Sequence, residues 1–548
     1  MTQKTTASKQ PDGTAGAHSE QSVAQIPGGI PVLLGAAVVF ILSALIMMPF
    51  VPDDAYVSFR YAEHLADGYG LTFYPGEKPV EGYSNFLWVL LCALAHKLGF
   101  GLPGLMPLVS ILFGLLNVVV LWAIYRRRNV QAGHALLPLL LFATSGPFLV
   151  YSVSGMETPL FSLLLLLVVL FVDVVLSTGG RPAQLLLALT GVLLVLCRPE
   201  GIVIYPAAVA AILYSLRASN HSRSGNASRL RTLLLFAGAY VVFAAIYFIW
   251  KGSYFGEYIP PSFWARGSGM AGWMENIRMY FVNPGNDNPP LGYYYLALIV
   301  LSLSGTSGSQ RGTERFSLLL AVALALIYFC FVDPLPGMRY DAALIGLLFL
   351  PMVHLPGAVK KNIEWKDCNR MRALRWLVIV AAVALNYSWT ANLNVAVRRI
   401  ERGNQIGRVD LAEWLKKLFP SRSLLAMSDV GAFSYYSGFK TLEINPEPVT
   451  VPRDAWETSA LDMLSGQWPD VILLESLGIF EANFGPFYDS LINSSDFKQR
   501  YRVLGAARTD WFEDRCYWIY VPKELPLQPE EKLQEFPGGI SDFGEVDR

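Results

Sequence analysis

Residues 30–51 read IPVLLGAAVVFILSALIMMPFV and are followed directly by PDDAYVSFRYAEHL at residues 52–65. The first stretch is too long for a signal-peptide core and no small-residue cleavage site follows it, so we expect a retained signal anchor that forms the first membrane span. The second stretch has the spacing of a short amphipathic helix that ends at Asp67 and Gly68. The fold is therefore predicted to begin with a span that leads into a surface helix.

The composition points to an integral membrane protein. Of 548 residues, 53% are hydrophobic and 16% are charged, and the mean hydropathy is +0.38, which is more apolar material than one aqueous core needs. The 43 basic and 43 acidic residues cancel, so nucleic acid is excluded as the main partner. The five cysteines lie far apart, which indicates neither a disulfide framework nor a zinc site.

The chain divides into three predicted parts. Residues 1–29 are polar and lack apolar periodicity, so we expect a disordered cytoplasmic tail. Residues 30–391 are predicted to form an all-α polytopic bundle of about eleven spans. The apolar stretches lie near 30–51, 105–125, 134–150, 159–177, 183–197, 202–216, 232–250, 291–305, 317–332, 342–356 and 375–391.

The apolar stretch from Asn85 to Gly99 is short and carries His96 and Lys97, so its position depends on the charge of the loops. If it lies flat on the outer surface, sixteen Lys and Arg residues against three acids fall in the inner loops, as the positive-inside rule favours. We therefore expect an interfacial helix here. This topology places outside the membrane the loops 52–104, 151–158, 198–201, 251–290 and 333–341 and everything after about 392.

The last part, residues 392–548, carries charges throughout and alternates short apolar runs with polar segments. Residues 423–427, 471–474 and 517–521 have the pattern of strands, and residues 410–418 that of an amphipathic helix. A mixture of this size predicts a small soluble α/β domain on the outer side of the membrane.

Asp53 and Asp54 stand at the outer end of the first span. Adjacent carboxylates repel each other and partial desolvation raises at least one pKa, which suits a general base or a cation site. The pair is equally compatible with two acids that only mark the end of a span. Spacing alone does not separate these interpretations.

Two further outer loops carry single acids and bases close to spans. Glu157 precedes Thr158 and Pro159, where a negative charge either stabilises a helix N-terminus or belongs to a site. Arg198 and Glu200 lie between two very apolar stretches, so they either neutralise each other or Arg198 binds phosphate.

Two more outer loops carry charged residues. Lys251, Glu257 and Arg266 lie in the loop 251–290, and Arg339 lies in the loop 333–341. Acids and bases from four separate loops are thus predicted to meet at one face of the bundle. A lipid-linked donor needs cations for its phosphate at this depth, and an acceptor hydroxyl needs a base that faces water. The predicted layer supplies both.

The first outer loop, residues 53–88 (DDAYVSFRYAEHLADGYGLTFYPGEKPVEGYSNFLW), resembles that of GT-C superfamily glycosyltransferases. It is most similar to arabinofuranosyltransferases that use polyprenyl-phosphate arabinofuranose, such as the terminal β-1,2 enzyme of the mycobacterial envelope and the pilin enzymes. GMETPL at 155–160, RPEG at 198–201, YFGxxxP at 254–260 and DxxxGxRY at 333–340 resemble the same group in the same order. The resemblance covers roughly residues 30–445.

The resemblance implies a GT-C bundle with two membrane-parallel helices in the first outer loop, and it implies roles for the residues at the matching positions. The catalytic base would be an Asp of the Asp53–Asp54 pair, with Asp53 preferred and Asp54 assisting, and Glu157 would be a further functional carboxylate. Candidates for the donor phosphate are Arg198, Arg266 and Arg339, and candidates for substrate contact are Arg60, Glu81, Tyr83, Lys251 and Glu257. The third loop departs from the family pattern P-N-T followed by lysine, since it has Pro261-Ser262 and Arg266.

We therefore expect a multi-pass protein of the bacterial inner membrane with its catalytic face and C-terminal domain in the periplasm. It would be an inverting glycosyltransferase that moves D-arabinofuranose from a polyprenyl-phosphate donor to a hydroxyl of an envelope glycan or glycoprotein. The chemistry requires no cofactor because the leaving group is already an anion, and Mg²⁺ or Mn²⁺ at the acids is left open. The alternatives are another lipid-phosphate sugar (mannose, glucose or aminoarabinose), a flippase for lipid-linked sugars, and a noncatalytic envelope scaffold.

Overall fold

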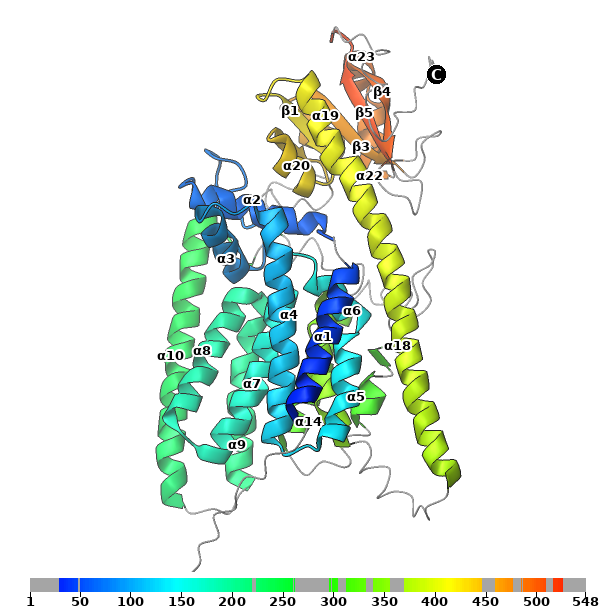
Figure 1. Ribbon diagram of the computed structural model, residues 1–548. Helices are drawn as coiled ribbons and strands as arrows, with labels where there is room; N and C mark the ends of the chain where they lie inside the picture. Colours follow the sequence, from blue (N-terminus) through cyan, green and yellow to red (C-terminus); the bar gives the residue numbers. More distant parts are fainter. Residues whose placement is uncertain are drawn as a thin grey trace, which may run out of the picture.

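The protein is a tall bundle of helices with a smaller domain built on a sheet at one end (Figure 1). The computed structural model describes residues 29–47, 50–218, 223–259, 261, 295–296, 298–303, 312–331, 339–354, 369–445, 459–476, 484, 486–508 and 516–525. The predicted tail, residues 1–29, lies outside this part of the chain except for Gly29, which begins the first helix.

The helices of the bundle lie at predicted apolar stretches, while the count of about eleven spans stays a prediction. Among the described residues, five helices are long and apolar enough to cross a membrane, or six if one bent pair counts as a span. The chain is thus a multi-pass membrane protein. The helices are α1 Gly29–Met47, α4 Leu102–Arg127, α5 Ala132–Ala143, α6 Gly146–Ser152, α7 Thr158–Thr178, α8 Arg181–Cys197, η1 Pro199–Val203, α9 Ile204–Ala218, α10 Arg223–Phe255, α14 Gly312–Phe331, α15 Arg339–Ala342, α16 Ile345–Phe349, η4 Pro351–His354 and α18 Asn369–Asn404.

The stretch predicted as one span at 134–150 is broken into α5 and α6, which meet at an angle of 59°. Pro147 in the first turn of α6 has no N–H for a continuous helix. Carbonyl groups freed in this way are costly in the membrane, and α18 satisfies one of them. Thr390 donates its hydroxyl to the Thr144 carbonyl at 2.7 Å, and the Asn386 amide donates to the Thr144 hydroxyl at 2.7 Å. The break directs α6 toward the loop that carries Glu157.

Two short helices cover the end of the bundle nearest the soluble domain. They are α2, Asp53–Ala66, and α3, Phe86–Lys97, and α2 lies across the ends of the spans (Figure 1). The helix expected over 85–99 is therefore present as α3, and it is too short to span the membrane on its own.

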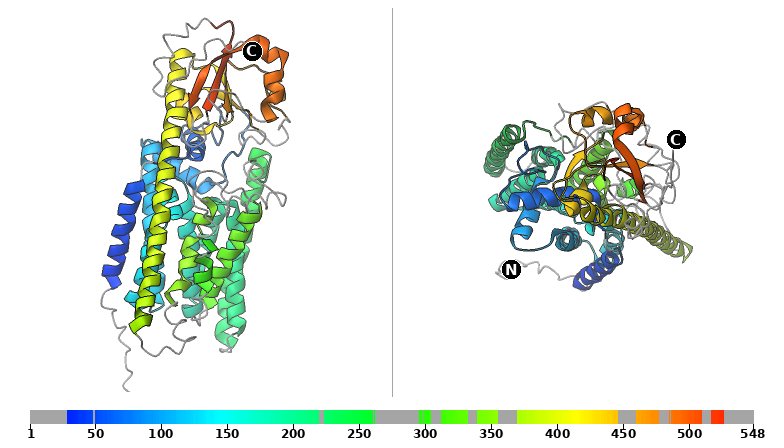
Figure 2. Two further views of the ribbon diagram at one scale, coloured as in Figure 1. Left: turned by 90° about the vertical axis from the view of Figure 1, so that its right-hand side faces the viewer. Right: turned by 90° about the horizontal axis from the view of Figure 1, so that it is seen from above.

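The long helix α18 connects the bundle to the soluble domain (Figure 2). The boundary predicted at residue 392 falls inside this helix, which continues to Asn404 and passes through the π-helix η5, Gln405–Asp410, into α19, Leu411–Leu418. The sheet that follows confirms the α/β assignment, with the strand order β2-β1-β3-β5-β4. Its strands are β1 Leu424–Met427, β2 Lys440–Glu443, β3 Val471–Ser476, β4 Tyr501–Arg508 and β5 Cys516–Pro522, and its helices are α20 Gly431–Ser437, α21 Ala460–Ser465, α22 Pro486–Asn493 and α23 Ser495–Arg500.

Strand β1 pairs in parallel with β2 and β3, whereas β5 pairs antiparallel with β3 and β4. The sequence pattern predicted β1, β3 and β5 but not the two edge strands β2 and β4. Edge strands are buried less evenly, and β2 alternates between exposed and buried residues over only four positions. Helix α20, which precedes β2, contacts α2 and so connects this domain to the end of the bundle.

Candidate active site

The loop between α6 and α7 is held in place by side chains from two other helices. Trp88 of α3 donates its indole N–H to the Gly155 carbonyl at 3.0 Å. From α4, Ser110 donates to the Met156 carbonyl at 3.0 Å, and the Asn117 amide donates to the Pro159 carbonyl at 2.8 Å. Backbone groups on both sides of Glu157 are thereby fixed, so its carboxylate has a defined position.

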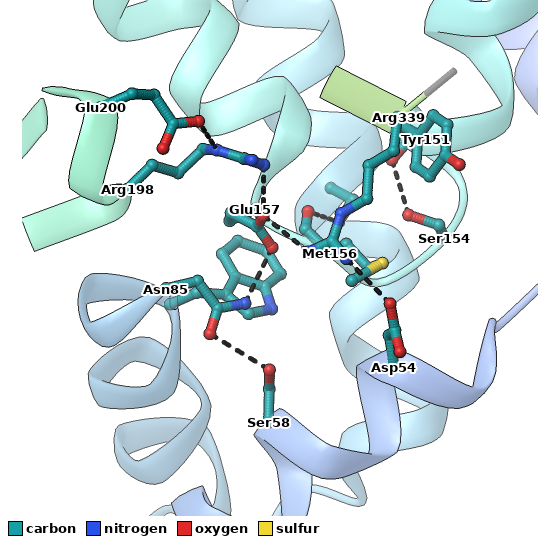
Figure 3. Close-up of polar contacts among 12 residues, drawn as sticks. Asp54, Ser58, Asn85, Tyr151, Ser154, Met156, Glu157, Arg198, Glu200 and Arg339 are labelled. Carbon is teal, nitrogen blue, oxygen red and sulfur yellow. Dashed lines mark hydrogen bonds and ion pairs between the residues drawn. The ribbon is translucent and has the colours of Figure 1, made fainter. Parts of the chain in front are cut away.

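Glu157 is completely buried and lies at the centre of a network of ion pairs (Figure 3). One carboxylate oxygen, Oε1, accepts from Arg198 at 3.0 Å and from Arg339 at 2.8 Å. The other, Oε2, accepts from the Asn85 amide at 2.8 Å, and Asn85 in turn accepts from the Ser58 hydroxyl at 3.2 Å. Glu157 occupies the cap position of α7 but makes no side-chain cap bond, so the interpretation as a simple helix cap does not describe it.

The network extends to one partly exposed acid. Arg339 also donates to Asp54 at 3.1 Å, and the Asp54 side chain is 36% exposed. At the buried end, Arg198 donates to Glu200 at 2.6 Å and lies 4.4 Å from the centre of the Tyr340 ring. The predicted Arg198–Glu200 pair is therefore real, but it is one part of a larger cluster that leads to the surface at Asp54.

The two arginines keep Glu157 ionised. Burial alone would raise the pKa of this carboxyl, but Arg339, Arg198 and the Asn85 amide outweigh it and lower the pKa to about 2. Glu157 therefore carries its charge throughout the physiological range. A carboxylate without an exposed oxygen and with this pKa is suited to hold cations in place rather than to take up a proton.

Asp53 lies next to Asp54 in the chain but faces a different part of the protein. Its two oxygens accept the backbone N–H groups of Gly431 at 3.1 Å and Ala432 at 2.7 Å, at the start of α20. Arg408 of η5 is 3.6 Å from Asp53. The preferred residue of the predicted pair thus contacts the soluble domain, and its neighbour Asp54 contacts the buried network.

The other predicted substrate residues form separate groups. Glu81 and Lys251 make an ion pair of 2.8 Å with both side chains 4% exposed, and burial raises the pKa of Glu81 to about 7 although Lys251 opposes this. Tyr83 packs beside them against Phe255, at 6.4 Å between ring centres. Glu257 lies close enough for its charge to raise the pKa of Glu81 further.

Arg60 faces the soluble domain rather than the network around Glu157. It is buried, donates to the carbonyls of Phe73 and Ser434, and stacks on the Phe73 ring. Arg266, the remaining candidate for the donor phosphate, lies outside the described residues.

Sequence reasoning did not assign roles to Ser58, Asn85, Ser110 and Asn117, which position Glu157. Polar side chains inside apolar helices are costly unless they bind something, so Ser110 and Asn117 within α4 carried a usable signal. Arg408 had no such signal, because its partner Asp53 is far away in the sequence. Within the described ranges, no three His, Cys, Asp or Glu side chains are arranged so that they could hold a metal ion.

Comparisons with known proteins identify the fold. No family model matches the chain, and no curated protein matches it. Among solved structures, ArnT from Cupriavidus metallidurans bound to undecaprenyl phosphate is similar with a TM-score of 0.55 and 14% identity over 89% of this chain and 97% of ArnT, and its apo state gives the same values. The arabinofuranosyltransferase AftD from Mycobacteria gives a TM-score of 0.50 and 14% identity over 89% of this chain and 40% of AftD. These similarities show that the chain shares the fold of these solved structures.

Proposed function

We propose that the protein is an inverting glycosyltransferase that moves a sugar from a polyprenyl-phosphate donor to a hydroxyl of an envelope glycan or glycoprotein. The reaction would take place at the outer face of a bacterial inner membrane. The observation that carries this proposal is the chain of contacts from buried Arg198 through Glu157 and Arg339 to the partly exposed Asp54. It provides a water-facing carboxylate beside a fixed cation at the end of a membrane bundle.

In this proposal Asp54 is the catalytic base. A base needs an oxygen that an acceptor hydroxyl can reach, and Asp54 is 36% exposed, whereas both oxygens of Asp53 accept backbone N–H groups. Asp54 removes the acceptor proton, the acceptor oxygen bonds to the anomeric carbon, and the bond from that carbon to the phosphate oxygen breaks. The electron pair leaves with the polyprenyl phosphate.

Arg339 supports the leaving group in the same step. Its guanidinium is held by Asp54 and Glu157, so its orientation is fixed before the donor binds. Its Nε–H is buried and has no partner among the described residues. Arg198 is connected to Asp54 only through Glu157 and Arg339, whereas Arg339 contacts Asp54 directly, so we assign the leaving phosphate to Arg339.

The sugar proposed for transfer is D-arabinofuranose. The first-loop resemblance to arabinofuranosyltransferases supports this choice, and the structural likeness to AftD agrees with it. The similarity to ArnT, whose solved structure holds undecaprenyl phosphate, supports a polyprenyl carrier. The soluble domain would then lie in the periplasm, above the face at which the acceptor arrives.

The test is release of polyprenyl phosphate by the purified protein from decaprenyl-phosphate arabinofuranose and from decaprenyl-phosphate mannose, each with an envelope glycan extract as acceptor. We expect release from the arabinofuranosyl lipid and not from the mannosyl lipid. Release from the mannosyl lipid alone would change the sugar and keep the enzyme class. Movement of intact donor across proteoliposomes without any release would replace the transferase with a flippase.

A further inference from the structure

Helix α2 presents polar side chains on two faces that contact different parts of the molecule. Residues separated by seven positions lie on one face of a helix, and so do residues separated by four. Asp53 and Arg60 both contact α20 of the soluble domain. Asp54 and Ser58 both point into the network around Glu157 (Figure 3).

The contact between α2 and α20 involves the whole length of the shorter helix. Asp53 accepts the N–H groups of Gly431 and Ala432, which have no partner inside α20 because they open it. Arg60 donates to the Ser434 carbonyl one turn later. Tyr56 lies between them and packs against Tyr435, at 5.4 Å between ring centres.

Charged groups of the soluble domain surround the Asp53 end of this contact. Arg408 lies 3.6 Å from Asp53 and pairs with Asp429 at 2.6 Å, and Asp429 accepts from the Tyr517 hydroxyl at 2.9 Å. The first turn of α2 is thus connected through one arginine to strand β5 in the centre of the sheet's antiparallel half. The backbones also approach closely, since a Cβ on Gly431 would lie 2.3 Å from the Asp53 carbonyl oxygen.

We infer that Asp53 is a positioning residue, and that it fixes the first turn of α2 against α20 so that Asp54 faces Arg339. The inference rests on the proposed function for its kinetic consequence, because it takes Asp54 as the base. It assigns the soluble domain a task in the reaction, because the domain completes the catalytic face. Misplacement of a catalytic group by about 1 Å costs up to roughly 100-fold in rate, so a contact of this kind is measurable.

Two substitutions break the contact from opposite sides. Asp53→Asn removes the charge and one of the two acceptors, and Gly431→Ala places a methyl group against the Asp53 carbonyl. The matched control is Gly466→Ala in the same domain, where a Cβ meets nothing within 4 Å. Hydrogen exchange of the amides in residues 429–438 reports the contact without any substrate.

We expect both variants to speed exchange at the start of α20, and Gly466→Ala to leave it unchanged. Unchanged exchange in Asp53→Asn would overturn the contact whether or not the protein is a transferase. In donor turnover, we expect each variant to lower kcat by about tenfold and to change the KM for the donor less, because Glu157 still holds Arg339 when Asp54 moves.

The double variant separates positioning from direct catalysis. If Asp53 acts through α20, Asp53→Asn and Gly431→Ala damage the same contact, so the double variant turns over as slowly as the slower single variant. If Asp53 is itself the base, its loss alone costs about 100-fold or more and the two effects multiply, which would overturn the inference. A wild-type protein without turnover would contradict the proposed function, and the exchange result would still decide the contact.

Discussion

Glu157 shows at the scale of single residues how the bundle tolerates charges that are out of contact with water. A buried carboxylate with one cationic partner rarely repays its desolvation, but Glu157 has two arginines and an amide. The two arginines share one of its oxygens and come from loops that are distant in the sequence. The cluster is therefore a junction between α7, η1 and α15 as well as part of a site.

We predict that Glu157→Gln lowers the thermal stability of the detergent-purified protein strongly, because it removes the only fully buried carboxylate in the described network and leaves each of two buried guanidinium groups with one partly exposed acid. Removal of one partner of a buried pair typically costs about 3–5 kcal/mol. Glu157→Asp keeps the charge and should lose less. A melting temperature for Glu157→Gln equal to that of the wild type would show that the arginines are not held by this carboxylate.

The planar guanidinium of Arg339 bonds Asp54 and Glu157 at the same time. A lysine ammonium is a point charge and does not reproduce this fork. Arg339→Lys should raise the KM for the donor lipid by about tenfold. As a control, Arg126 is exposed and lies in the last turn of α4, so Arg126→Lys should leave this KM unchanged. An unaltered donor titration in Arg339→Lys would remove Arg339 from the phosphate contact.

Residue spacing predicted that acids and bases would converge, but it did not separate Asp53 from Asp54. Neighbours on a helix point about 100° apart, so one of the two has to face away from any single site. Which one does so depends on Gly431 and Ala432, which are brought beside α2 only by the folded soluble domain. No local pattern in the first outer loop contains that information.

Between secondary-structure elements, the contact of α2 with α20 is sensitive to pH. Burial raises the pKa of Asp53 to about 6, Arg408 opposes this, and Asp429 and Asp54 add to it. The folded protein therefore binds this proton more tightly than the unfolded chain does. The stabilisation associated with Asp53 is complete below the unfolded pKa of 3.8 and is lost as the pH rises through about 6.

The measurement is the difference in melting temperature between the wild type and Asp53→Asn at pH 5 and at pH 7.5. Asparagine does not titrate, so the advantage of the wild type should shrink as the pH rises. Glu157 is present in both proteins, so its own titration cancels in this difference. An advantage that grows with pH would mean that attraction to Arg408 outweighs the cost of burial.

Elements with a clear periodicity of apolar residues were predictable from the sequence, and elements fixed by distant contacts were not. The interfacial helix α3 and the strands β1, β3 and β5 followed from apolar pattern and charge. The break between α5 and α6 had a local signal in Pro147, but the groups on α18 that make it tolerable, Asn386 and Thr390, are distant in the sequence. The continuation of α18 beyond residue 392 depends on equally distant contacts, since Arg398 donates to the Ile46 carbonyl and Glu401 accepts from the Val51 N–H.

At the scale of the whole molecule, the charges of the loops assign one side of the membrane to the soluble domain and the other to the loop between α4 and α5. We predict that Lys498→Cys on α23 reacts with a membrane-impermeant maleimide in intact cells. Gln131→Cys, which precedes α5, should react only after permeabilisation. Both positions are exposed, and the described native cysteines, Cys92, Cys197 and Cys516, are buried. Reaction of Gln131→Cys in intact cells would reverse the topology.

We place the reaction of a polyprenyl-phosphate sugar at the face of α2 that carries Asp54. The most direct test is the rate of polyprenyl phosphate release from decaprenyl-phosphate arabinofuranose by the wild type, Asp54→Asn and Asp67→Asn, with the same acceptor extract. Asp67 ends the same helix and is 52% exposed, so Asp67→Asn makes the same chemical change outside the site. We predict that Asp54→Asn lowers the rate by about 100-fold or more and that Asp67→Asn leaves it unchanged. Release by Asp54→Asn at the wild-type rate would show that Asp54 is not the base.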